Sequence, residues 1–110
     1  MLDQTMKPLR FGHLVIWPPF VAAPVAGYTD AVYREILREF GCPYCYTEMI
    51  SAKGLALGGK AILALLEHSE HDRPLAVQLF GADPDDMSKA VRVIHQTDML
   101  FDAVDINMGC

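Results

Sequence analysis

The chain has 110 residues, enough for one small domain, and its 52% hydrophobic and 21% charged residues are ordinary for a globular core. Its net charge of −5 excludes a general basic surface for a nucleic acid, no apolar run approaches the ~20 residues of a membrane span, and residues 1–7 lack the order of a secretory signal. Three cysteines are too few, and odd in number, for a disulfide scaffold, so we expect the reducing cytoplasm.

The first third of the chain predicts a hairpin, a short strand and a helix. Residues 8–20 carry apolar side chains on both sides of Gly12 and are stopped by two prolines at 18 and 19, which is typical of a short hairpin. Residues 20–23 predict a strand. Residues 24–27 follow with small side chains, so a flat ligand could lie against their backbone, although a plain turn is the alternative. Apolar residues then recur at helical spacing over residues 30–40.

The segment after this helix predicts a second strand, residues 43–49, with Glu48 at its carboxyl end. It begins with Cys42-Pro43-Tyr44-Cys45, which is also the redox motif of glutaredoxins. In those proteins the first cysteine lies at a helix amino end, where the helix dipole favours thiolate. Here the motif follows a helix and enters a strand, so structural cysteines are the favoured interpretation.

Residues 51–59 predict a glycine-containing loop, and residues 60–67 a helix. His68 and His71 come next, and together with Cys42 and Cys45, which lie a wide gap earlier, they invite a zinc-site hypothesis. Their spacing misses that of zinc fingers, so we expect no metal site.

The last third predicts a strand over 75–81, a helix over 83–96 and a strand over 103–107. Gln78 lies inside the first of these strands. A buried carboxamide without partners costs about 1 to 3 kcal/mol, and either a ligand or neighbouring strand ends could supply those partners.

Strands alternate with helices every ~25 to 30 residues, which predicts an α/β fold with a parallel sheet. Ligands of such sheets bind at the carboxyl ends of the strands. Those ends carry residues 24–27, Glu48, Gln78 and residues 107–110. Their convergence predicts a site there.

Four stretches together resemble the tRNA-dihydrouridine synthases. They are residues 23–30 (APVAGYTD), 47–54 (TEMISAKG), 73–84 (RPLAVQLFGADP) and 104–110 (VDINMGC), in the family's order and spacing. The resemblance implies the first half, about four β/α units, of a TIM (β/α)8 barrel with an N-terminal hairpin. It also implies an enzyme that reduces uridine in tRNA to 5,6-dihydrouridine, with FMN as hydride carrier and NADPH as reductant.

The same resemblance implies residue roles. The residues that would contact FMN are Pro24, Val25, Ala26, Gln78 and Asn107. Cys110 would be the general acid, because a thiol can give the proton that reduction of uracil requires. Glu48 matches a family carboxylate and would belong to the architecture of the site.

The chain departs from the family pattern in two ways. Val25 stands where the family commonly has methionine, which keeps an apolar flavin contact but changes its shape. The second half of the barrel, with a flavin-contacting lysine and histidine, and the helical tRNA-binding domain do not occur in residues 1–110. We therefore expect an N-terminal part of an FMN-binding barrel domain that binds FMN poorly alone, is inactive alone, and meets tRNA mainly through other regions.

Three alternatives stay open at this stage. Another FMN-dependent barrel oxidoreductase, such as a dihydroorotate dehydrogenase-like enzyme, also offers asparagine and cysteine at its strand ends. A non-catalytic flavin-binding module would need no acid at residue 110. A glutaredoxin-like protein would instead require a reactive Cys42.

Overall fold

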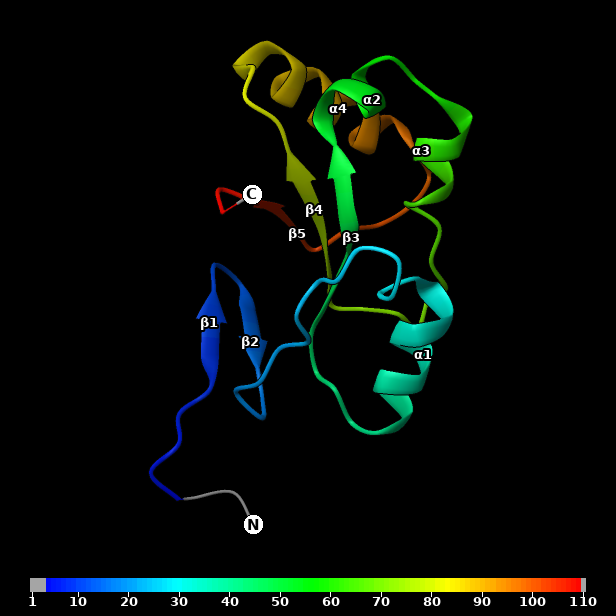
Figure 1. Ribbon diagram of the computed structural model, residues 1–110. Helices are drawn as coiled ribbons and strands as arrows, with labels where there is room; N and C mark the ends of the chain where they lie inside the picture. Colours follow the sequence, from blue (N-terminus) through cyan, green and yellow to red (C-terminus); the bar gives the residue numbers. More distant parts are fainter. Residues whose placement is uncertain (1–3, 110) are drawn as a thin grey trace.

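The computed structural model describes residues 4–109 (Figure 1). In chain order the elements are β1 (Leu9–Phe11), β2 (Leu14–Ile16), α1 (Ala31–Glu39), β3 (Cys45–Ser51), α2 (Ala52–Ala56), α3 (Lys60–Ala64), β4 (Leu75–Phe80), α4 (Pro84–Gln96) and β5 (Ala103–Ile106). The result is a mixed α/β fold around a parallel sheet.

The sheet consists of β3, β4 and β5 in that order, and both pairings are parallel. Helical connections join successive strands, as parallel pairing requires. The register between β3 and β4 shifts between Tyr46 and Met49, where the Gln78 N–H donates to the Thr47 hydroxyl oxygen at 3.0 Å. An irregularity of this kind interrupts the ladder of hydrogen bonds locally, here in the middle of β3.

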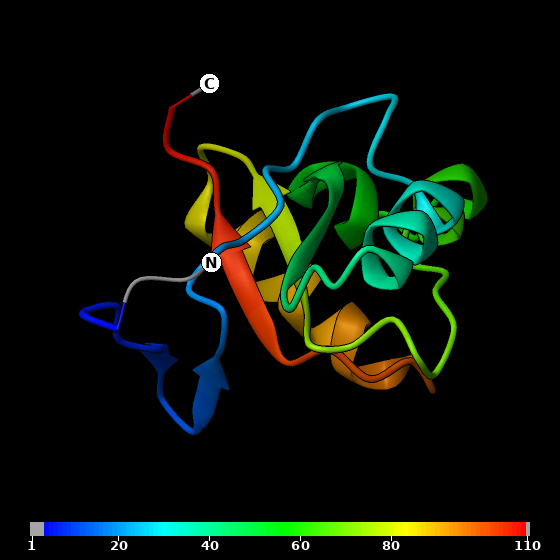
Figure 2. The ribbon, with the colours of Figure 1, turned by 90° about the horizontal axis from the view of Figure 1, so that it is seen from below.

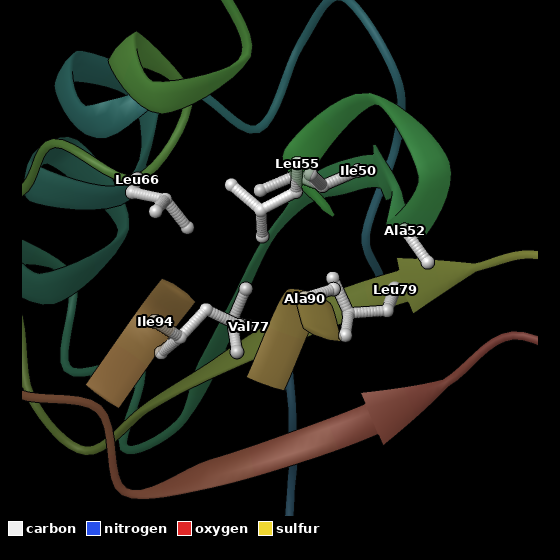
Figure 3. Packing of buried hydrophobic residues seen from close by; sticks show 8 residues of the cluster. All are labelled: Ile50, Ala52, Leu55, Leu66, Val77, Leu79, Ala90 and Ile94. Atoms are coloured by element: carbon white, nitrogen blue, oxygen red, sulfur yellow. The ribbon is translucent and has the colours of Figure 1, made fainter. Parts of the chain in front are cut away.

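One face of the sheet packs against the helices (Figure 3). The buried residues of this core are Ile50, Ala52, Leu55, Leu66, Val77, Leu79, Ala90 and Ile94. They come from β3, β4, α2, α4 and the turn after α3. Each fully buried aliphatic side chain of this kind contributes about 1.5 to 3 kcal/mol relative to exposure, so this layer is the main source of packing stability.

The opposite face meets the hairpin formed by β1 and β2 (Figure 2). Ile16, Tyr44 and Ala76 are buried there, and Leu9 and Ala103 pack against them. Burial raises the pKa of Tyr44 to about 12, with a smaller contribution from neighbouring Tyr46. The hairpin therefore covers the amino-terminal end of this sheet face with apolar contacts.

Side-chain caps mark the starts of α1 and α4. Asp30 accepts from the Tyr33 N–H at 2.8 Å, and Asp83 accepts from the Asp85 N–H at 2.8 Å with Pro84 in the first turn. Both arrangements satisfy amide groups that the first helical turn leaves free. None of the helices within residues 4–109 is long and apolar enough to cross a membrane.

Helix α1 is held by an ion-pair network. The Arg34 Nε lies 2.7 Å from Asp72 Oδ2, and the Arg38 Nη2 lies 3.2 Å from Asp72 Oδ1. Arg34 also donates to the carbonyl oxygens of Thr29 and Glu67. Arg34 and Asp72 are each 1% exposed, so the network fixes α1 to the segment before β4 from inside the protein.

The structure corrects three expectations. Residues 20–23 form no strand: the Phe20 N–H turns back to the Pro18 carbonyl oxygen, and the bond from the Ala22 N–H to the Tyr44 carbonyl oxygen does not extend into a ladder. Residues 51–59 are not simply a loop, because Ser51 caps α2 by accepting from the Gly54 N–H. Helix α3 ends at Ala64, three residues earlier than expected.

Candidate functional site

The candidate site lies at the carboxyl ends of β3, β4 and β5. Val77 and Leu79 of β4 face the helices, whereas Ala76 packs towards the hairpin. Because side chains alternate along a strand, Gln78 shares the face of Ala76. The register places Asp105 of β5 beside Gln78. The hairpin-facing side of the sheet thus becomes polar towards its carboxyl end.

Gln78 is the centre of a short hydrogen-bond chain. Its Nε2 donates to Asp105 Oδ2 at 2.6 Å, and its Oε1 accepts from Asn107 Nδ2 at 3.4 Å. The Asn107 side chain also contacts Met49 Sδ at 3.4 Å and accepts from the Gly109 N–H at 2.9 Å. Gln78 and Asn107, each predicted as a contact of the flavin, therefore lie in direct contact with one another.

Glu48 anchors the loop before α1. Its Oε1 accepts from the Gly27 N–H at 2.6 Å. Gly27 has a φ of 79°, a conformation that residues with a Cβ rarely adopt. The Val25 carbonyl oxygen accepts from the N–H groups of Tyr28 and Thr29, which closes the turn. Glu48 was expected at the end of its strand, but β3 continues to Ser51, so this carboxylate lies in the middle of β3 and holds the loop at Gly27 from there.

The two groups of contacts meet at β3. Consecutive residues of that strand reach them: Glu48 contacts Gly27, and Met49 contacts Asn107. In the loop, Pro24 is half-buried, Ala26 is exposed and the Val25 side chain is 46% exposed, so apolar surface is available there. Cys110, the expected acid, lies outside the described residues.

Asp105 was not identified from the sequence. The signal that could have found it is its alternation with Asn107 in a short strand, which puts both on one face. Its charge also influences neighbouring groups: burial, and secondarily the Asp105 carboxylate, raise the pKa of Tyr46. Both the negative charge and the hydrogen bond to Gln78 belong to the site's electrostatics.

The cysteine pair lies at the other end of β3. The Sγ atoms of Cys42 and Cys45 are 3.8 Å apart. Burial raises the pKa of the Cys45 thiol to about 12, although the Arg38 guanidinium acts in the opposite direction. A thiol held in its neutral form is a poor nucleophile, so Cys45 fits a structural role. Within residues 4–109 no three His, Cys, Asp or Glu side chains are grouped to hold a metal ion.

Comparison with known proteins identifies the family. The family model described as dihydrouridine synthase (Dus) matches residues 21–110. A probable tRNA-dihydrouridine synthase of Aquifex aeolicus is 37% identical over 90 residues, which are 82% of this chain and 28% of that protein. A probable tRNA-dihydrouridine synthase of Treponema pallidum is 30% identical over 103 residues, 94% of this chain and 30% of the relative.

A third relative gives the same picture. The tRNA-dihydrouridine synthase B of Serratia marcescens is 32% identical over 102 residues, 93% of this chain and 30% of the relative. This chain therefore spans less than a third of the length of these relatives. The matched region includes β3, β4, β5 and the polar groups at their carboxyl ends. The chain belongs to the dihydrouridine synthase family.

Proposed function

We propose that residues 1–110 provide the N-terminal part of an FMN-binding TIM-barrel catalytic domain. The enzyme would reduce uridine in tRNA to 5,6-dihydrouridine, with NADPH as reductant. The observation that carries this proposal is the hydrogen-bonded pair Gln78 and Asn107 at the carboxyl ends of neighbouring parallel strands. In barrels of parallel strands, that end is where substrates and cofactors bind.

The residues present fit a flavin. Its ring system needs a flat apolar surface and hydrogen-bonding groups at the pyrimidine edge. Pro24, Val25 and Ala26 offer the apolar surface on a loop whose position Glu48 sets. Gln78 and Asn107 offer amide groups that both donate and accept. These five residues would therefore hold FMN.

Bound FMN supplies the hydride chemistry. The chain's own residues would position the uracil and protonate it. Asn107 would orient the uracil beside the flavin, and the Cys110 thiol would give a proton to the carbon that does not receive the hydride. Glu48 would keep residues 24–27 in place through the Gly27 N–H.

Exposed apolar side chains support the barrel assignment. Phe20 and Val21, before the loop, are 54% and 40% exposed, and Val104 and Ile106 of β5 are 40% and 51% exposed. Large exposed apolar areas at the margins of a sheet are typical of surfaces that other elements cover. Further strand–helix units of a (β/α)8 barrel would cover both margins.

The proposal assigns little tRNA contact to this segment. Its net charge of −5 gives no basic field for phosphate groups, so other regions would supply most of the binding. The isolated chain should bind FMN weakly and should not reduce uridine, because half a barrel contacts only part of the flavin.

The proposal can be tested in a graft. In the Aquifex aeolicus relative, the matched segment is replaced by the corresponding residues of this chain, and the purified graft is examined for bound FMN and for NADPH-dependent loss of uracil absorbance in unmodified tRNA. We expect both. Cys110→Ala should abolish reduction and keep FMN, whereas the control Cys42→Ala should change neither.

Other outcomes would contradict the proposal in different ways. Reduction of a free pyrimidine in preference to tRNA would indicate a dihydroorotate dehydrogenase-like enzyme. If the graft binds FMN and Cys110→Ala has no effect on reduction, the Cys110 thiol is not the proton donor. Stoichiometric FMN and uridine reduction by the isolated 110-residue chain would overturn the expectation that this segment is insufficient.

A further inference from the structure

The hydrogen-bond chain through Gln78 has a defined direction. At one end the Gly109 backbone N–H can only donate, and it donates to Asn107 Oδ1. At the other end the Asp105 carboxylate, when ionised, can only accept, and it accepts from Gln78 Nε2. Each carboxamide between these ends has one orientation that pairs a donor with an acceptor at both contacts.

We propose that Asp105 is a positioning residue that fixes the orientation of the Gln78 carboxamide, so that its carbonyl oxygen faces the site as an acceptor for a ring N–H of the ligand. The inference rests on the proposed function, and it adds a residue whose part in the site was not expected.

Distances and burial support the role of Asp105. The 2.6 Å contact between Gln78 Nε2 and Asp105 Oδ2 is short, as expected when a carboxylate is the acceptor. The contact on the oxygen side is longer, 3.4 Å from Asn107 Nδ2, and leaves accepting capacity on Gln78 Oε1. Gln78 is 7% exposed, so water competes little for these groups. Asp105 therefore has the stronger influence on the orientation.

The strand direction places the oxygen towards the site. Asn107 follows Asp105 by two residues on the same face and lies nearer the carboxyl end of the sheet. With its nitrogen bound to Asp105, Gln78 directs its oxygen to the Asn107 side. A ring edge with an N–H between two carbonyl groups, as in the flavin pyrimidine ring, needs an acceptor there. If the Gln78 carboxamide were reversed, its N–H groups would face the ring N–H, and neither group could accept a hydrogen bond from the other.

The first test uses the 110-residue chain and does not require FMN. In NMR spectra of the isotopically labelled chain, the Nε2 protons of Gln78 should differ widely in chemical shift, because one of them binds a carboxylate. Asp105→Asn offers both a donor and an acceptor, so this difference should shrink towards that of a free carboxamide. Asp102→Asn is the matched control: it removes a charge beside the opposite end of β5, and it should leave the Gln78 signals unchanged.

The second test measures FMN affinity in the graft defined above. Loss of one oriented hydrogen bond should raise the dissociation constant about three- to tenfold in Asp105→Asn. Asp102→Asn should leave it unchanged. Unchanged Gln78 signals in Asp105→Asn would overturn the inference, and so would altered signals with unchanged FMN affinity. If the graft with the native segment does not bind FMN, the proposed function fails, and the ligand assigned to Gln78 fails with it.

Discussion

Removing the charge of Asp72 should destabilise the chain more than any exposed charge change. Asp72 accepts hydrogen bonds from Arg34 Nε at 2.7 Å, Arg38 Nε at 3.3 Å and Arg38 Nη2 at 3.2 Å. Asp72→Asn keeps the side-chain volume but leaves two guanidinium groups without their counter-charge. Removing one partner of a buried ion pair costs about 3 to 5 kcal/mol. We expect about 3 kcal/mol, because backbone carbonyl oxygens continue to accept from Arg34.

Urea denaturation of the 110-residue chain, followed by far-ultraviolet circular dichroism, measures this loss. Glu70→Gln is the control, because the Glu70 and His71 side chains pair at 3.6 Å while 87% and 89% exposed. Exposed pairs contribute little, so no measurable change is expected there. A loss below about 1 kcal/mol in Asp72→Asn would refute the reasoning, since it would mean that water or a rearrangement compensates both arginines.

Three further predictions concern the loop, the thiol and acid stability. Glu48→Ala should speed hydrogen exchange at the Gly27 amide, whereas Glu48→Gln keeps an acceptor and should change it less; equal rates would contradict the 2.6 Å contact. Cys45 should resist iodoacetamide at pH 8 in the folded chain and react in urea, because burial raises its pKa to about 12. Equal rates of Cys45 alkylation in the folded and the urea-unfolded chain would contradict a buried, neutral thiol. Burial acts to raise the pKa of Asp102, but hydrogen bonds from Arg73 and the Leu75 N–H outweigh it and lower the pKa below the usual 3.8. Its stabilisation is therefore complete above about pH 4 and lost as the pH falls further, so Asp102→Asn should lower the urea midpoint at pH 7 and have little effect near pH 2; an equal effect at both would contradict the assignment.

The parallel sheet was predictable because its signals are local. Apolar runs bounded by turn residues predict β3, β4 and β5, and the cap at Asp83 with Pro84 predicts the start of α4. The alternation of strands and helices then implies parallel pairing. The three strands and their polar carboxyl ends follow from these patterns alone.

Other features depend on contacts between distant residues. Arg34 lies on an amphipathic helix, where an arginine is normally expected at the surface, and only the position of Asp72 38 residues later explains its burial. Helix α2 depends on a cap at Ser51, in a segment whose glycines predict a loop. Asp105 can accept from Gln78 only because β5 lies beside β4 in the observed register. Such pairings are not encoded in any short window of sequence.

The division of one sheet face into two parts explains how a polar site can coexist with a small core. At the amino-terminal end the hairpin buries Ile16 against Tyr44 and Ala76, so that part needs no polar partners. Two residues beyond Ala76, Gln78 is buried too, but it is polar and satisfies its amide through Asp105 and Asn107. A carboxamide that is already held by neighbouring side chains loses little conformational freedom when a ligand arrives. The hydrogen bonds that stabilise the folded chain thus also prepare the site for binding.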